Sequence, residues 1–301
     1  MDKVFYNKSS ADSLGWEPEW FGATDHDEKL VKAIRAWQKK NRLTADGLCG
    51  PSTYRRIWTE RDSEISDYIN FCPPDKNDSF IICNSEPVLI EWPKVVLWDE
   101  QGGLDLDRGY YDYSGKPDRK PTMFVNHWDV CLSAKSCANV LQKRGISVHF
   151  CIDNDGTIYQ LLDTQHGAWH AGVGKINHKS IGVEISNAYY PKYQGWYEKN
   201  GFGPRPVIDD AWVNGSKLSK HLGFYDVQVR AAQALWKACA SAYDIPLKSI
   251  NSGNSDFLTS TKTERSVANG TFKGVVSHYH ITKKKIDCAG LDIVKLIEEI
   301  K

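Results

Sequence analysis

From about residue 95 onward, the chain alternates between strand-like and helix-like segments, and this alternation constrains the fold more than any other feature. Short apolar runs indicate strands at 122–125, 147–153, 157–162, 180–186 and 274–279. Helical periodicity follows or separates these runs at 133–143, 226–243 and 291–300. Strands that alternate with helices predict an α/β domain with a β-sheet flanked by helices.

The second and third strand-like runs are joined by Asn154-Asp155-Gly156, a strong signal for a hairpin turn. The string Asp153-Asn154-Asp155-Gly156 also has the look of a calcium-binding loop. Its twelfth position is Thr164, however, where such a loop needs a bidentate glutamate. We therefore expect a β-hairpin here. Two long insertions interrupt the later part of the pattern, and long loops of this kind tend to carry function; they cover residues 188–222 and 249–273.

At roughly 150 residues per domain, a chain of 301 residues accommodates about two domains. Residues 25–58 have helical periodicity of their own. Asp25 and Glu28 have the spacing of a capping box, and a second short helix can begin at Ser52 or Thr53. We predict a small all-α domain, a connector without assigned structure, and a larger α/β domain; their ranges are 1–60, 61–94 and 95–301.

The charge balance excludes some partners. There are 38 Lys and Arg against 38 Asp and Glu, and a net charge of zero argues against nucleic acid or an anionic membrane surface as a partner. The start of the chain lacks a signal-peptide pattern, and no apolar run reaches the roughly 18 residues of a membrane span. We expect a soluble protein made in the cytoplasm, with its eight cysteines reduced. The 11 Trp and 14 Tyr suit either a core or a surface that stacks on sugars.

Two histidines end predicted strands, and both have candidate partners for metal binding. His127 ends the strand that contains 122–125, and His278 lies near the end of the last strand. Asp287 and Cys288 follow His278 by nine and ten residues. Two neutral imidazoles, one anionic ligand and an open fourth position make a catalytic zinc site. Taken alone, the residues leave open whether these histidines bind metal or are buried core residues. His280 is a rival ligand, because it would share a strand face with His278.

Five sequence blocks in a fixed order resemble a known enzyme family. They are Phe124-Val125-Asn126-His127, residues 147–160, Trp169-His170-Ala171-Gly172, Ser180-Ile181-Gly182-Val183-Glu184, and Ser277-His278 with Lys285-Ile286-Asp287. The series resembles the zinc-dependent type 2 N-acetylmuramoyl-L-alanine amidases, a family shared by phage lysins, bacterial wall-recycling amidases and animal peptidoglycan recognition proteins. The resemblance covers residues 95–301 and implies a central mixed β-sheet flanked by helices.

Residues 33–54 separately resemble the small three-helix peptidoglycan-binding domain found beside many cell-wall hydrolases. The Trp37-Gln38 pair, the Asp46-Gly47 turn and the string Gly50-Pro51-Ser52-Thr53-Tyr54 carry this second resemblance. It implies a cell-wall-binding module whose characteristic residues are Trp37, Gln38, Asp46 and Tyr54.

The first resemblance implies one Zn²⁺ per chain, held by His127, His278 and Asp287. Cys288 stands where the family usually has proline, and it is an alternative third ligand because a thiolate also binds zinc. Glu184 fills the position of the acid–base glutamate of the recycling branch, while Val148 stands where the phage lysozyme-type branch has a tyrosine. Lys285 would stabilise the oxyanion.

Further roles follow from the same resemblance. Trp169, His170 and Asn177 would lie near the substrate, with packing alone as the open alternative for His170. His280 would lie beside the site or at the surface without binding metal. Independently of the resemblance, the apolar strand around His149 favours a core role for this residue. The implied reaction cleaves the amide between N-acetylmuramic acid and L-Ala of the stem peptide.

The missing signal peptide fits a monomeric phage endolysin that waits in the host cytoplasm and reaches the wall, its partner, once another protein opens the membrane. The alternative is a recognition or virion-structural protein that keeps the fold and binds peptidoglycan without cleaving it.

Overall fold

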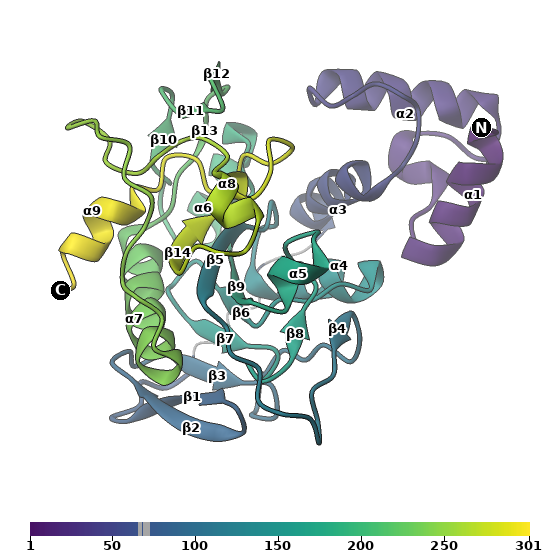
Figure 1. Cartoon of the computed structure of the whole chain (residues 1–301). Helices are drawn as coiled ribbons and strands as arrows, with labels where there is room; N and C mark the ends of the chain where they lie inside the picture. The colour runs from purple at the N-terminus through teal and green to yellow at the C-terminus, as the bar shows by residue number, and fades with distance from the viewer. Residues whose placement is uncertain (66–67, 69–72) are drawn as a thin grey trace. The chain divides into compact units, whose positions relative to one another are not determined.

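The structure is a computed structural model that describes residues 1–65, 68 and 73–301. It divides into two compact units, Met1–Asp67 with Lys143–Gly145, and Tyr68–Gln142 with Ile146–Lys301 (Figure 1). Six residues of the predicted connector, 66–67 and 69–72, lie outside the described residues. None of the helices in the described ranges is long and apolar enough to cross a bilayer. Seven cysteines are free thiols, and the eighth, Cys72, is not among the described residues.

The first unit is all-helical. Its elements are α1 (Lys3–Leu14), a 3₁₀ turn η1 (Pro18–Phe21), α2 (Glu28–Lys40) and α3 (Pro51–Ile65). Helix α2 begins after Asp27, whose carboxylate accepts hydrogen bonds from the amides of Lys29 and Leu30. The predicted capping box at Asp25 is therefore wrong, because the residue two positions later satisfies the free amides of the first turn.

A buried glutamine ties these helices together at the turn between α2 and α3. The amide nitrogen of Gln38 donates to Asp46 Oδ1 and Thr53 Oγ1, at 2.8 and 3.0 Å. Its oxygen accepts from the amide of Gly47 at 2.8 Å. The side chain of Asn7, on α1, bonds to the backbone of the same turn. Because the Gln38 and Asn7 side chains are buried and their hydrogen bonds are satisfied, they specify the turn instead of weakening it.

The second unit is built on a six-stranded sheet in the order β14-β5-β9-β6-β7-β3 (Figure 1). Strands β14, β5, β9 and β6 run parallel to one another, β7 is antiparallel to β6, and β3 is parallel to β7. The mixed α/β architecture is confirmed, and β6 and β7 form the expected hairpin. The strand bounds are β3 (Val95–Leu97), β5 (Met123–Trp128), β6 (Phe150–Ile152), β7 (Ile158–Gln160), β9 (Ser180–Ile185) and β14 (Gly274–Ser277).

Helices and two-stranded ribbons surround this sheet. The helices are α4 (Ala134–Arg144), α5 (Gly174–Asn177), α6 (Gln194–Lys199), α7 (Asp226–Tyr243), α8 (Arg265–Ala268) and α9 (Ile293–Glu298), with 3₁₀ turns η2 (Pro191–Tyr193) and η3 (His278–His280). The ribbons pair β1 (Ser79–Cys83) with β2 (Glu86–Ile90), β4 (Tyr110–Tyr111) with β8 (Gly167–Ala168), β10 (Val207–Ile208) with β13 (His221–Leu222), and β11 (Trp212–Val213) with β12 (Ser216–Lys217).

Three parts of the chain differ from the sequence expectation. The last strand ends at Ser277, and the next three residues form the turn η3. The closing helix α9 is shorter than predicted. The region 61–94, for which no structure was assigned, contains the end of α3 and the β1–β2 hairpin.

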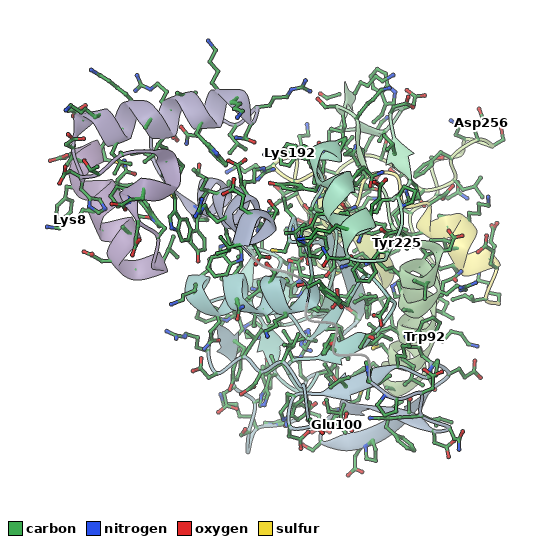
Figure 2. All side chains as sticks on the ribbon, turned by 180° about the vertical axis from the view of Figure 1, so that it is seen from behind. Lys8, Trp92, Glu100, Lys192, Tyr225 and Asp256 are labelled. Carbon is green, nitrogen blue, oxygen red and sulfur yellow. The ribbon has the colours of Figure 1, made fainter. Side chains whose placement is uncertain are left out.

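The two faces of the sheet have different cores. On one face, Ile181, Val183 and Ile185 pack in the larger core with α7, where Trp236 donates from its indole to Asn126 Oδ1 at 3.0 Å. Trp92, labelled in Figure 2, packs against this core. On the other face, Met123 and Val125 belong to a smaller core with residues of α5 and α8. Because strand side chains alternate, His127 and Glu184 point to this second face.

Candidate metal centre

Three side chains predicted as ligands converge at the end of β5. His127 Nδ1 lies 3.1 Å from Asp287 Oδ2, and His278 Nδ1 lies 3.0 Å from the same oxygen. The two imidazole rings are 4.5 Å apart and nearly perpendicular. All three residues are buried, with 2%, 2% and 8% of their surface exposed. One oxygen and two nitrogens therefore point at a common centre in the protein interior.

The backbone explains why these residues meet. Strand β14 pairs with β5 in parallel, with Ser277 opposite Asn126, so the next residues of the two segments lie side by side at the same edge of the sheet. These next residues are His127 and His278. The amide of Tyr279 donates to the carbonyl of Asp287 at 3.1 Å, which folds the intervening loop back onto η3.

The donor set fits a zinc ion. Four ligand atoms bonded tetrahedrally at about 2.0 Å lie roughly 3.3 Å apart, close to the separations observed here. Burial lowers the pKa of His127 to about 4, so this imidazole is neutral at pH 7 and can offer a lone pair. Burial alone raises the pKa of Asp287, but the neighbouring His278 and His127 imidazoles outweigh this effect. The pKa of Asp287 is consequently well below its usual value, and the carboxylate is anionic.

The structure brings Asp287, and not Cys288, to the two imidazoles. The Cys288 side chain is fully buried in the larger core, and burial raises the pKa of its thiol well above the usual value. Another buried group of potential ligands, Asp129, Cys131 and Cys137, lies elsewhere in the described part of the chain. The carboxylate of Asp129 accepts hydrogen bonds from the hydroxyl of Ser186 and two backbone amides, so it already ties β5 to the end of β9.

Glu184 and Lys285 both lie near this centre. In the β5–β9 pairing Glu184 stands opposite His127, so the two side chains are neighbours on one face of the sheet. Glu184 is 6% exposed. Lys285 is half-buried; after burial and the charge of His278, its ammonium is a further cause of the lowered pKa of His127. A carboxylate and an ammonium thus accompany the three candidate ligands.

The predicted substrate residues have three different surroundings. Trp169 is 39% exposed, and its indole meets the ring of Tyr111 edge-on. Asn177 is buried, and its side-chain oxygen accepts from the amide of Ala171 at 2.8 Å, which closes the loop between them. His170 contacts a candidate ligand directly, with Nδ1 2.9 Å from His127 Nε2. The sequence did not predict this contact, since it depends on how the 169–177 loop crosses β9.

Two other histidines bind backbone. His280 Nδ1 accepts from the amide of Ser277, and its Nε2 lies 2.7 Å from the carbonyl of Ser260. His149 Nδ1 accepts from the amide of Gly182 at 3.0 Å, in the interior of the unit. Both imidazoles are used within the fold, and the ligand atoms at the centre belong to His127, His278 and Asp287.

In the first unit, the four predicted wall-binding residues separate by exposure. Gln38 and Tyr54 are buried, so they hold the unit together and cannot touch a polymer directly. Trp37 is half-buried and donates from its indole to Glu60, while Asp46 is exposed.

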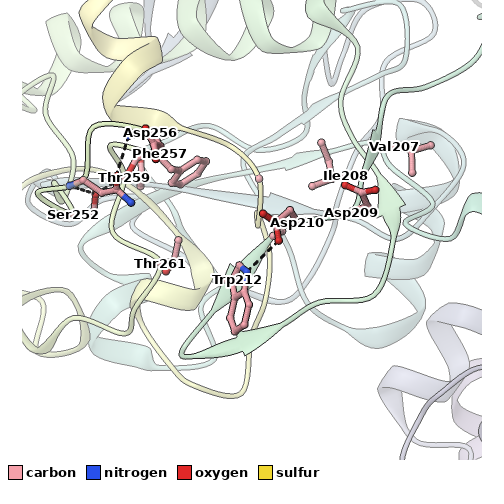
Figure 3. A pocket seen from close by; sticks show the side chains of 13 residues that line it. Val207, Ile208, Asp209, Asp210, Trp212, Ser252, Asp256, Phe257, Thr259 and Thr261 are labelled. Carbon is pink, nitrogen blue, oxygen red and sulfur yellow. Dashed lines mark hydrogen bonds between the residues drawn. The ribbon is translucent and has the colours of Figure 1, made fainter.

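The two insertions together line a cavity of about 660 Å³ (Figure 3). The indole of Trp212 donates to Asp210 Oδ1 at 3.3 Å on one side, and Phe257 lies on the other. Gly290, three residues after Asp287, completes the lining. The cavity volume is in the range of small-molecule pockets.

Outside this cavity, Tyr225, labelled in Figure 2, lies with its ring over the guanidinium of Arg205.

Two imidazoles and a carboxylate at one edge of an α/β sheet are a donor set typical of hydrolytic metal sites. Residues 117–290, more than half of the chain, match the family described as N-acetylmuramoyl-L-alanine amidase, and the chain belongs to this family. Residues 21–57 match the putative peptidoglycan binding domain.

Several solved structures are similar to the chain. The endolysine N-acetylmuramoyl-L-alanine amidase LysCS from Clostridium intestinale is 15% identical, with 69% of this chain and 95% of that chain covered and a TM-score of 0.37. Staphylococcus aureus hydrolase AmiA is 12% identical, with 63% and 66% covered and a TM-score of 0.36. Drosophila peptidoglycan recognition protein SA is 17% identical, with 69% and 90% covered and a TM-score of 0.30. A comparison with curated proteins gave no match.

Proposed function

We propose that the protein hydrolyses the amide between the lactyl group of N-acetylmuramic acid and L-Ala of the peptidoglycan stem, with one zinc ion per chain as cofactor. The observation that carries this proposal is the convergence of His127 Nδ1, His278 Nδ1 and Asp287 Oδ2. Three protein ligands leave a fourth position open, as catalytic zinc sites require. When bound, zinc acts as a Lewis acid and lowers the pKa of water to about 7.

The remaining steps belong to residues around the centre. Glu184, beside His127 on the same sheet face, accepts the proton of the attacking water and returns it to the leaving nitrogen. A positioned acid–base group of this kind contributes about 10²- to 10⁴-fold. Lys285 stabilises the negative charge that develops on the carbonyl oxygen during attack. Trp169, with its exposed indole, is our candidate for contact with the substrate.

The first unit supplies attachment to the wall in this proposal. Because the net charge of the chain is zero, attachment depends on shaped contacts and not on bulk electrostatic attraction to the polymer. We further propose that the protein is a monomeric phage endolysin, made in the host cytoplasm and released to the wall at lysis. The pairing of an amidase domain with a peptidoglycan binding domain in one chain supports this role.

The test uses the zinc-loaded full chain on purified peptidoglycan, with the release of N-terminal L-Ala amines measured over time. We expect amine release by the wild type and its near-complete loss in Glu184→Gln, which keeps the size of the side chain. Stoichiometric zinc without amine release would show a non-catalytic peptidoglycan-binding protein and overturn the proposal.

A further inference from the structure

The imidazole of His170 is held between β9 and His127. Its Nδ1 lies 2.9 Å from His127 Nε2, and its Nε2 lies 3.1 Å from the hydroxyl oxygen of Ser180. The rings of His127 and His170 are nearly perpendicular, with centroids 5.0 Å apart. His170 therefore connects strand β9 to a candidate metal ligand through two hydrogen bonds.

The direction of these hydrogen bonds follows from Ser180. Its hydroxyl donates to the carbonyl of Ile176 at 2.7 Å, and a carbonyl oxygen can only accept. A hydroxyl has one proton to donate, so the oxygen of Ser180 accepts from His170 Nε2–H. A neutral imidazole with its proton on Nε2 has a lone pair on Nδ1. His170 Nδ1 therefore accepts from His127 Nε2–H, and the lone pair of His127 is on Nδ1.

Strand β9 also provides the space for this ring. A Cβ atom at Gly182 would lie 2.8 Å from both Cγ and Nδ1 of His170, closer than such atoms approach in proteins. Ser180 and Gly182 share one face of the strand with Glu184, because side chains alternate along it. On this face, Ser180 hydrogen-bonds to His170, Gly182 leaves room for its ring, and Glu184 lies beside His127.

We propose that His170 is a positioning residue that holds His127 in the tautomer with its lone pair on Nδ1, directed at the metal centre. This inference rests on the proposed role of His127 as a metal ligand. With no proton on His127 Nδ1, two electron-rich atoms, this nitrogen and Asp287 Oδ2, lie 3.1 Å apart. A cation between them satisfies both. The structure thus gives His170 a role toward the metal, where the sequence suggested contact with substrate.

The first test measures zinc affinity by titrating the metal-free full chain with Zn²⁺ against a competing chelator. Groups that hydrogen-bond to a metal-ligating histidine raise the metal affinity by about 10- to 100-fold. We expect His170→Leu to lower the zinc affinity by this factor. We expect His170→Asn to restore most of the affinity, because its amide oxygen occupies the δ position and accepts from His127. The matched control His178→Asn removes a half-buried histidine that stacks on Tyr111 and has no contact with His127 in the described structure.

The second test reads the tautomer directly from long-range ¹H–¹⁵N spectra of the metal-free chain. We expect His127 to carry its proton on Nε2 in the wild type and on Nδ1 in His170→Leu. If His170→Leu does not fold, Gly182→Ala displaces the ring while leaving its chemistry intact, and the same change of tautomer is expected.

A wild-type His127 protonated on Nδ1, or equal zinc affinity in the wild type and the leucine variant, would overturn the inference. Neither readout uses turnover, so a protein that cleaves no peptidoglycan but follows this pattern would refute the proposed function alone.

Discussion

Asp287 and Cys288 are adjacent in the chain but have opposite surroundings, so their alanine variants should fail in different ways. The carboxylate of Asp287 faces both imidazoles at 3.0 and 3.1 Å. Removing a group that only hydrogen-bonds to a metal ligand lowers the metal affinity by about 10- to 100-fold. Removing the ligand itself, in Asp287→Ala, should therefore lower the zinc affinity by more than roughly 100-fold.

Cys288→Ala removes a fully buried sulfur from the larger core. The lost transfer free energy is about 0.8 kcal/mol, as for one methylene group. The cavity left behind raises the expected loss in the free energy of unfolding to about 1–2 kcal/mol. Zinc affinity should be unchanged, because the thiol contacts neither imidazole.

The assay compares metal content per chain after dialysis in zinc–chelator buffers with urea unfolding of the same samples. We expect Asp287→Ala to lose zinc and Cys288→Ala to keep it with a lower unfolding midpoint. A folded Cys288→Ala chain without zinc, beside an Asp287→Ala chain that retains it, would refute this assignment of the third ligand.

Three further predictions concern separate parts of the molecule. Glu184→Gln should retain zinc and lose about 10²- to 10⁴-fold in turnover, measured as amine release; unchanged turnover would place the base elsewhere. Burial raises the pKa of Asp153 to about 6. The folded state therefore favours the protonated side chain, which contributes its full stabilisation below pH 3.8 and loses it as the pH rises through 6. At about 1.4 kcal/mol per pKa unit, the unfolding free energy of the wild type should fall by up to about 3 kcal/mol relative to Asp153→Asn over this range, and parallel pH curves would contradict it. Gln38→Ala leaves buried groups such as the Gly47 amide without a partner, at about 1–3 kcal/mol each, so hydrogen exchange of the full chain should accelerate within residues 28–57 and not in the amidase unit.

The longest patterned elements could be predicted from the sequence because their apolar spacing is set by the sheet that they cover. Helix α7 has the expected bounds, and β9 ends one residue before the prediction. The four two-residue strands of the 188–222 insertion could not be predicted, since pairs this short have no periodicity. The turn η3 was missed because the end of β14 depends on the hydrogen bond from the Ser277 amide to the His280 Nδ1 atom, which strand periodicity does not indicate.

The candidate site was predicted through resemblance more than through spacing. His127 lies near the end of β5 and His278 directly follows β14; these strands are neighbours only in the folded sheet, and the sequence separation of the two histidines carries no sign of this. Asp287 and Cys288 were both plausible ligands, and the path of the loop after η3 decides which one faces the imidazoles. The contact between His170 and His127 requires a hydroxyl at Ser180 and space at Gly182, neither of which indicates a partner by itself.

The most direct test of a zinc-dependent amidase titrates Zn²⁺ into the metal-free full chain in the presence of purified peptidoglycan. The products are identified by mass spectrometry. We expect activity to rise linearly and to level off at one zinc per chain, with stem peptides released that begin at L-Ala and glycan strands that keep their lactyl groups. Cleavage by the metal-free chain, or products cut at a glycosidic or an internal peptide bond, would contradict the account.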